Sequence, residues 1–176
     1  AKIAFLLGKY TSALKGFERT LELNPKSKEA YMLQGKCMAS IKDYRNAIKS
    51  FEKAIKIDPN DEIGYSNSGN VKAAQKQFKE AIVDFGKVIR LSPNDAIAYT
   101  QRGTAKAELK DYKGAILDYD KAIKLDERHR SGYSNRGKVK AEMGDYQAAI
   151  SDFDRAINID ARYKTAFYNR GVAKHN

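Results

Sequence analysis

The sequence predicts an all-α solenoid built from antiparallel helix hairpins, and three observations support this fold class. The first is a set of five glycines, each separated from the next by 34 residues: Gly35, Gly69, Gly103, Gly137 and Gly171. The second is a set of five alanines at the same interval: Ala13, Ala47, Ala81, Ala115 and Ala149. The third is that all three prolines, Pro25, Pro59 and Pro93, follow this interval. A strict internal period of this length indicates a repeat array.

Each repeat contains two segments with helical spacing of apolar residues. With the glycine taken as the eighth position, the first segment of the repeat at 28–61 carries a short stripe around Tyr31 and Gly35. In the second segment, Tyr44, Ala47 and Phe51 fall at i, i+3 and i+7, which is one face of a helix. Short polar turns join the two segments, and proline at the thirty-second position ends the second. The repeat is therefore helix, turn, helix, turn.

The recurring small residues indicate close helix packing. Glycine costs about 1 kcal/mol relative to alanine inside a helix. Its recurrence at one helical position predicts that another helix passes too close there for a side chain. One such hairpin cannot bury its apolar face alone, so neighbouring hairpins must stack.

The pattern of Tyr31, Gly35, Tyr44, Ala47, Phe51, Ala54 and Pro59 resembles the tetratricopeptide repeat. The resemblance covers essentially the whole chain. It implies a right-handed superhelix whose first helices line a concave groove. Glu127 and Ala161 stand where the pattern has proline, which affects the turns after the last two full repeats.

The register divides the chain into a single solenoid, residues 1–176. We expect a partial repeat at 1–27, full repeats at 28–61, 62–95, 96–129 and 130–163, and the first helix of a further repeat at 164–176. Because the sequence opens and closes within expected first helices, we expect a fragment of a longer chain.

Composition excludes several classes of function. The charged fraction is 31%, and the absence of a long apolar run predicts no transmembrane segment. A single cysteine, Cys37, does not indicate an oxidising compartment, and a cytoplasmic location is favoured. The two histidines, His129 and His175, have no metal-ligand spacing, and no nucleophile arrangement surrounds Cys37. We therefore expect no enzyme, no metal and no cofactor in this segment.

The resemblance places carboxamide side chains in the groove. The sixth position of four successive first helices holds Asn67, Gln101, Asn135 and Asn169. Each carboxamide offers a donor and an acceptor, which suits the main chain of an extended peptide. The row resembles the asparagine ladder of peptide-binding tetratricopeptide proteins such as the O-linked N-acetylglucosamine transferase. The alternative is that these side chains bond neighbouring helices or water. Further candidate groove residues are Asn70, Lys36, Thr104, Lys138 and Tyr168.

The groove lining is expected to become more apolar toward the N-terminus, where it includes Met32, Leu33, Ile63 and Ile97. A guest segment that is polar in one half and apolar in the other would match this lining. The predicted function is an interaction scaffold that holds an extended segment of a partner protein.

The formal net charge of +11 raises the alternative of nucleic-acid or anionic-surface binding. Groove positions carry Lys36 and Lys138 against Glu29, Glu108 and Glu142, so nucleic acid is not expected in the groove. The excess lysine recurs at the eleventh and twenty-sixth positions, which we assign to a solvated outer face. A self-associating array, with end-to-end contacts through Phe167 and Val172, is a third possibility.

Arginine at the seventh position correlates with aspartate at the twenty-third position of the preceding repeat. We interpret this correlation as inter-repeat ion pairs: Asp84 with Arg102, Asp118 with Arg136, and Asp152 with Arg170. Such pairs would fix the stacking of neighbouring hairpins.

Overall fold

The computed structural model describes all 176 residues and contains eleven α-helices and no strand, which confirms the all-α prediction. The chain forms two compact units, residues 1–91 (unit 1) and 92–176 (unit 2). The helices of unit 1 are α1 (Lys2–Leu6), α2 (Tyr10–Leu23), α3 (Lys28–Ser40), α4 (Tyr44–Ile57), α5 (Glu62–Ala74) and α6 (Phe78–Leu91). Those of unit 2 are α7 (Ala96–Glu108), α8 (Tyr112–Leu125), α9 (Arg130–Glu142), α10 (Tyr146–Ile159) and α11 (Lys164–His175).

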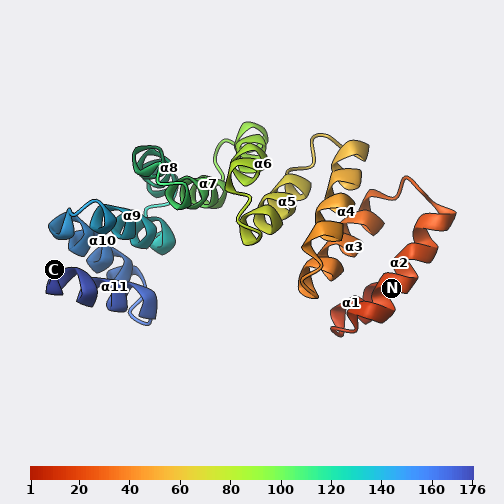
Figure 1. Cartoon of the computed structure of the whole chain (residues 1–176), viewed down its shortest axis with the longest axis horizontal. Coiled ribbons are helices and arrows are strands. Elements are labelled where there is room, and N and C mark those ends of the chain that lie inside the picture. The colour runs from red at the N-terminus through yellow and green to blue at the C-terminus, as the bar shows by residue number, and fades with distance from the viewer. The chain divides into compact units, whose positions relative to one another are not determined.

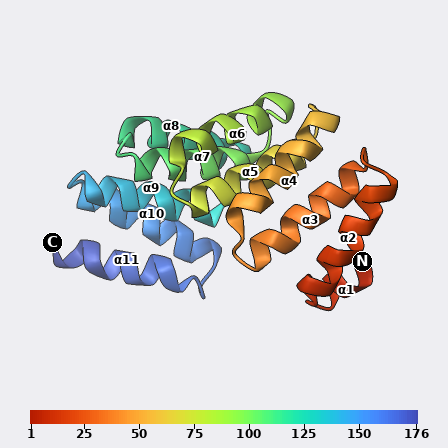
Figure 2. The ribbon, with the colours of Figure 1, turned by 45° about the vertical axis from the view of Figure 1, so that its right-hand side comes forward.

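Within each unit, consecutive helices form antiparallel hairpins that stack on their sequence neighbours (Figure 1). The first helix of each repeat begins where the 34-residue register places it, at Lys28, Glu62, Ala96, Arg130 and Lys164. In unit 2, α11 lies alongside α10, as the turned view also shows (Figure 2). The union of both units into one continuous solenoid stays a prediction of the sequence.

The turn inside each hairpin is a left-handed helix cap. After α3, Lys42 has φ 63°, its amide donates to the Ala39 carbonyl, and the Asp43 amide donates to the Met38 carbonyl. These two bonds define the Schellman motif. The same conformation recurs at Lys76, Lys110 and Gly144, each 34 residues after the last. Asp43, Asp111 and Asp145 then cap the next helix, each accepting a hydrogen bond from an amide in its first turn.

This repeated turn allows a reciprocal prediction. An L-residue in the left-handed region costs roughly 1 kcal/mol or more, whereas glycine enters it freely. We expect Lys110→Gly to raise the free energy of unfolding by about 0.5–1 kcal/mol and Gly144→Lys to lower it by about 1 kcal/mol. Urea denaturation followed by circular dichroism measures both. Changes of the same sign in the two variants would contradict the turn's conformation.

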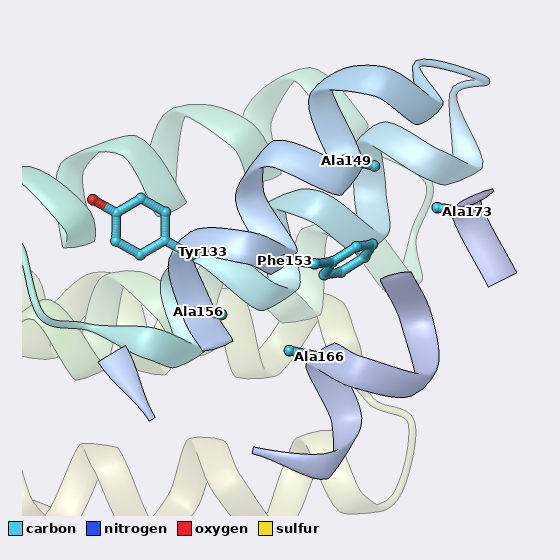
Figure 3. Packing of buried hydrophobic residues seen from close by; sticks show 6 residues of the cluster. All are labelled: Tyr133, Ala149, Phe153, Ala156, Ala166 and Ala173. Carbon is cyan, nitrogen blue, oxygen red and sulfur yellow. The ribbon is translucent and has the colours of Figure 1, made fainter. Parts of the chain in front are cut away.

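The core of each hairpin is an aromatic ring among alanines. In unit 2, the Phe153 ring packs with Ala149, Ala156, Ala166 and Ala173 (Figure 3). Equivalent rings in the other full repeats, Phe51, Phe85 and Tyr119, are each 1% exposed. A Cβ added at Gly35 would lie 2.6 Å from Phe51 Cε1, and one at Gly137 would lie 2.9 Å from Phe153 Cε1. At these two positions the aromatic ring of the same hairpin leaves no room for a side chain, in agreement with the predicted close approach.

Candidate functional site

Two clefts on unit 2 contain several of the predicted groove residues. The α7–α9 cleft has a volume of about 230 Å³, and its lining includes Thr104, Asn135 and Lys138. The α9–α11 cleft has a volume of about 260 Å³, and its lining includes Lys138 and Asn169. Every residue that lines the α9–α11 cleft lies 34 residues after a residue that lines the α7–α9 cleft. The clefts are therefore two copies of one feature, and they share Lys138 and Glu142 of α9.

The α7–α9 cleft has a polar floor. The Tyr119 hydroxyl donates to Thr104 Oγ1 at 3.3 Å, and Asn135 Nδ2 donates to the same oxygen at 3.3 Å. Thr104 Oγ1 in turn donates to the Thr100 carbonyl at 2.9 Å. One amide hydrogen of Asn135 thus joins α9 to α7, as the alternative interpretation of the carboxamides proposed. Its Oδ1 is not used in this bond.

The same two clefts are nearly neutral. Glu108, Lys110, Lys138 and Glu142 line the α7–α9 cleft, and Lys138 Nζ lies 3.7 Å from Glu142 Oε1. Glu142 also accepts a hydrogen bond from Tyr112. Burial is the main cause that raises the pKa of the Tyr112 hydroxyl, and this hydrogen bond is the second. Tyr112 and its counterpart Tyr146 line the clefts, and neither was among the predicted groove residues. Their recurrence at the seventeenth position is a signal that would have placed them at the cleft.

The α9–α11 cleft differs from its copy at the floor and on one wall. Phe153 replaces Tyr119, Ala173 replaces Val139, and Val172 stands where the other cleft has Lys138. The carboxamide of Asn169 makes no hydrogen bond with another residue. Within unit 2 the more apolar cleft is therefore the C-terminal one, whereas the sequence placed the apolar lining toward the N-terminus.

The remaining predicted groove residues lie outside these two clefts. Tyr168 is 73% exposed and lines a shallow surface of α11 with Phe167 and Val172. Gln101 is half-buried on α7, while Lys36, Asn67 and Asn70 belong to unit 1. The amide nitrogen of Asn67 is buried and has no hydrogen-bond partner. The structure thus gathers Thr104, Asn135, Lys138 and Asn169, which are four of the nine predicted residues.

The predicted inter-repeat ion pairs are wrong in their partners. Arg102 forms a bidentate pair with Asp118 (Nη2–Oδ1 2.6 Å, Nε–Oδ2 2.9 Å), and Arg136 does the same with Asp152. Each pair joins the two helices of one hairpin. The hydrogen bond to Asp118 is the main cause that raises the pKa of the Arg102 guanidinium.

Neighbouring hairpins are joined by a different aspartate. Arg136 also contacts Asp120, and Arg170 contacts Asp154, in both cases at 2.5 Å. These aspartates occupy the twenty-fifth position, two residues beyond the one that the correlation selected. Two residues along a helix turn the side chain by more than half a turn, so the two aspartates on α8 face different neighbours.

A second correction concerns the lysines at the eleventh position, which the sequence assigned to a solvated face. Lys72, Lys106 and Lys140 lie 2.7–2.8 Å from Asp84, Asp118 and Asp152, and their side chains are only 15–23% exposed. Asp84 also accepts from the Ser68 hydroxyl at 2.7 Å. We name these groups the hairpin triads: Ser68–Lys72–Asp84, Arg102–Lys106–Asp118 and Arg136–Lys140–Asp152. Part of the excess basic charge is therefore internal to the hairpins.

Tyr119 gives the fold a pH dependence at alkaline pH. Burial raises its pKa from 10 to about 12, while the hydrogen bond to Thr104 acts in the opposite direction. The pKa of Tyr119 is higher in the folded state than in the unfolded state. The contribution of the neutral hydroxyl to the free energy of unfolding is therefore complete below pH 10 and is lost as pH rises toward 12. At pH 11 the loss is about 1.4 kcal/mol.

The measurement compares wild type with Tyr119→Phe in urea at pH 9 and pH 11. Phenylalanine suits this register because Phe51, Phe85 and Phe153 hold it in other repeats. The free energy of unfolding should fall more steeply with pH in wild type, by about 1.4 kcal/mol over this interval. Identical slopes in the two proteins would contradict the raised pKa.

The structure holds no group of three His, Cys, Asp or Glu side chains that could bind a metal ion. His129 Nε2 lies 2.8 Å from the Thr100 hydroxyl, whose hydrogen is donated to the Ala96 carbonyl, so this ring nitrogen acts as the donor. None of the eleven helices has the length and the apolar character that a membrane span requires.

Comparison with known structures places this fold among repeat proteins. MamA (residues 41 to the end) from Desulfovibrio magneticus RS-1 is 23% identical and matches with a TM-score of 0.86 over 92% of each chain. TTC0263, a thermophilic TPR protein of Thermus thermophilus, is 20% identical, with a TM-score of 0.75 over 98% of this chain and 94% of that chain. YrrB, described as a TPR protein with an unusual peptide-binding site, is 25% identical, with a TM-score of 0.72 over 90% of this chain and 82% of that chain. A comparison with curated protein sequences found no match.

Family models cover most of the sequence. Models described as "Tetratricopeptide repeat" match residues 1–62 and 96–129, and one described as "TPR repeat" matches residues 69–110 and 137–176. The matched segments include all the glycines, alanines and prolines that recur every 34 residues. The chain belongs to the tetratricopeptide-repeat family.

Proposed function

We propose that this protein holds an extended segment of a partner protein across the α7–α9 and α9–α11 clefts of unit 2. Tetratricopeptide repeats generally serve as protein-interaction scaffolds, and the fold supports that general role here. The finer proposal rests on one observation. Unit 2 carries the same cleft twice in the 34-residue register, with a carboxamide at the equivalent position of each.

Repeated clefts suit a repeated ligand. The main chain of an extended peptide presents an amide and a carbonyl at every residue, and a carboxamide can bond both. Asn135 and Asn169 would bind two points of the same main chain. YrrB, with its described peptide-binding site, is a structural neighbour that favours this use of the fold.

The charge distribution favours a protein segment over nucleic acid. The cleft charges balance in sign, and the lysines of the hairpin triads are already paired with aspartates. Phosphate binding requires unpaired cations and weakens steeply with salt. Carboxamide contacts with a peptide should change little between 50 and about 200 mM salt, the range over which phosphate contacts lose orders of magnitude in affinity.

The test uses peptides recovered from a random 12-residue display library with the full chain as bait. Their affinities are then measured by fluorescence anisotropy for wild type, the double variant Asn135→Ala/Asn169→Ala, and the control Asn158→Ala. Asn158 is an exposed asparagine on α10 outside both clefts, so the control makes the same chemical change elsewhere.

Losing two hydrogen-bonding side chains should weaken binding by about 1–3 kcal/mol, and the control should bind as wild type does. Failure to recover any peptide, or equal affinities for all three proteins, would refute the proposal. A steep loss of affinity with salt would favour the anionic-ligand alternative.

A further inference from the structure

We infer that the two clefts select different side chains of the same peptide: the α7–α9 cleft an uncharged hydrogen-bond donor, and the α9–α11 cleft a large apolar group. This inference rests on the proposed function and specifies the ligand of the same site. It follows from the positions at which the two copies of the cleft differ.

The floor of the α7–α9 cleft presents an unused hydrogen-bond acceptor. Thr104 Oγ1 receives hydrogen bonds from both Tyr119 and Asn135 and donates its own hydrogen to the Thr100 carbonyl, so it offers nothing further as a donor. The oxygen of Tyr119 keeps a lone pair that these bonds do not use, and the α9–α11 cleft has no counterpart to it because Phe153 stands at that position. Serine, threonine, asparagine or glutamine side chains supply the matching donor.

The α9–α11 cleft lacks this polar floor. Phe153 and Ala173, 1% and 3% exposed, stand where the other cleft has Tyr119 and Val139. Val172 replaces a lysine on the wall. A polar guest side chain would lose its water here without gaining a partner at the floor, whereas an apolar side chain gains from burial.

The balanced charges of the lining residues disfavour charged peptide side chains in both clefts. The α7–α9 cleft has two glutamates and two lysines in its lining, and the α9–α11 cleft has only the paired Lys138 and Glu142. An added charge would find no net opposite charge in either cleft, so its desolvation would not be compensated. This balance argues for an uncharged segment of the partner at both positions.

The spacing of the two guest residues follows from the repeat. The clefts are one first helix apart, and packed helices lie about 8–10 Å apart. An extended chain advances about 3.1–3.4 Å per residue, so the two guests should be about three residues apart. The ligand motif is therefore an uncharged donor and a large apolar residue with about two residues between them.

The experiment exchanges the floors of the two clefts. Tyr119→Phe removes the hydroxyl from the α7–α9 cleft, and Phe153→Tyr adds one to the α9–α11 cleft. Each substitution places a residue that the other repeats already carry at this position, and thermal unfolding verifies that both variants fold. Wild type and both variants select from the same random 12-residue display library, and the recovered peptides are sequenced.

Wild type should enrich the two-residue motif. Tyr119→Phe should lose the preference for serine, threonine, asparagine and glutamine and keep the apolar preference. Phe153→Tyr should reduce the apolar preference. In resynthesised wild-type peptides, replacing the apolar residue by alanine should weaken binding at least about tenfold.

The outcomes separate the two proposals. Peptides that bind with no such motif, or with a motif that neither variant changes, would overturn the assignment of side chains while leaving peptide binding intact. Recovery of no peptide by wild type would overturn the proposed function, and this inference with it.

Discussion

Replacing Asp118 with alanine should lower the free energy of unfolding by about 3 kcal/mol, because it leaves two half-buried cations without a partner. The Asp118 side chain is 5% exposed and binds both Arg102 and Lys106. The Arg102 and Lys106 side chains are 23% and 20% exposed, so water replaces the lost carboxylate only in part. Urea denaturation at neutral pH measures the change.

The matched control is Asp120→Ala, on the same helix. Asp120 is 48% exposed and pairs with Arg136, which keeps its bidentate bond to Asp152. An exposed ion pair of this kind contributes about 1 kcal/mol or less. A loss at Asp120 as large as that at Asp118 would contradict the difference in burial.

A double-mutant cycle tests the partners directly. Asp118 should couple strongly to Arg102→Met and by less than about 0.5 kcal/mol to Arg136→Met. The reverse result would restore the pairing that the sequence correlation suggested.

The second large effect is that the same substitution at two equivalent glycines should change the free energy of unfolding in opposite directions. Gly35→Ala should lower the free energy of unfolding by about 1–3 kcal/mol, because the new methyl group would lie within 3 Å of three atoms of the buried Phe51 ring. Gly171→Ala should instead raise it by up to about 1 kcal/mol, since no atom lies within 4 Å of its Cβ position and alanine favours the helix. Thermal and urea unfolding of the two variants measure this pair.

The ring contact can be isolated by a second substitution. In a Phe51→Leu background, Gly35→Ala should cost less than in wild type because the smaller side chain leaves room for the methyl group. An unchanged cost in that background would mean that the ring is not the cause.

Much of the fold was predictable because helix periodicity and glycine spacing are local properties of the sequence. The register placed the start of all five first helices at the observed residues. It did not reveal the left-handed caps, because Lys42, Lys76 and Lys110 give no local signal for that conformation, whereas Gly8 and Gly144 at the same position of the repeat do. The Schellman bonds, which depend on the helix already being formed, impose this backbone on lysine.

The candidate site was predictable only in part. Thr104, Asn135, Lys138 and Asn169 line the clefts, because the family's groove positions carry over with the register. Tyr112 and Tyr146 were not predicted, because the same helical spacing is expected of an aromatic residue in the core and of one in a cleft wall. The hydrogen bond from Asn135 to Thr104 was undetermined for a similar reason, since a carboxamide serves a ligand or a neighbouring helix with the same atoms.

The sequence by itself determined the period, the helices and the residues that must pack closely, since each of these follows from spacing along one chain. Tertiary structure alone decided which charges meet. Arg102 and Arg136 repeat every 34 residues, as do Asp118 and Asp152, so a correlation between them is satisfied equally by a partner in the same hairpin or in the next. The packing of the two helices in a hairpin resolves this, because position twenty-three contacts positions seven and eleven of the same hairpin and position twenty-five contacts the next hairpin.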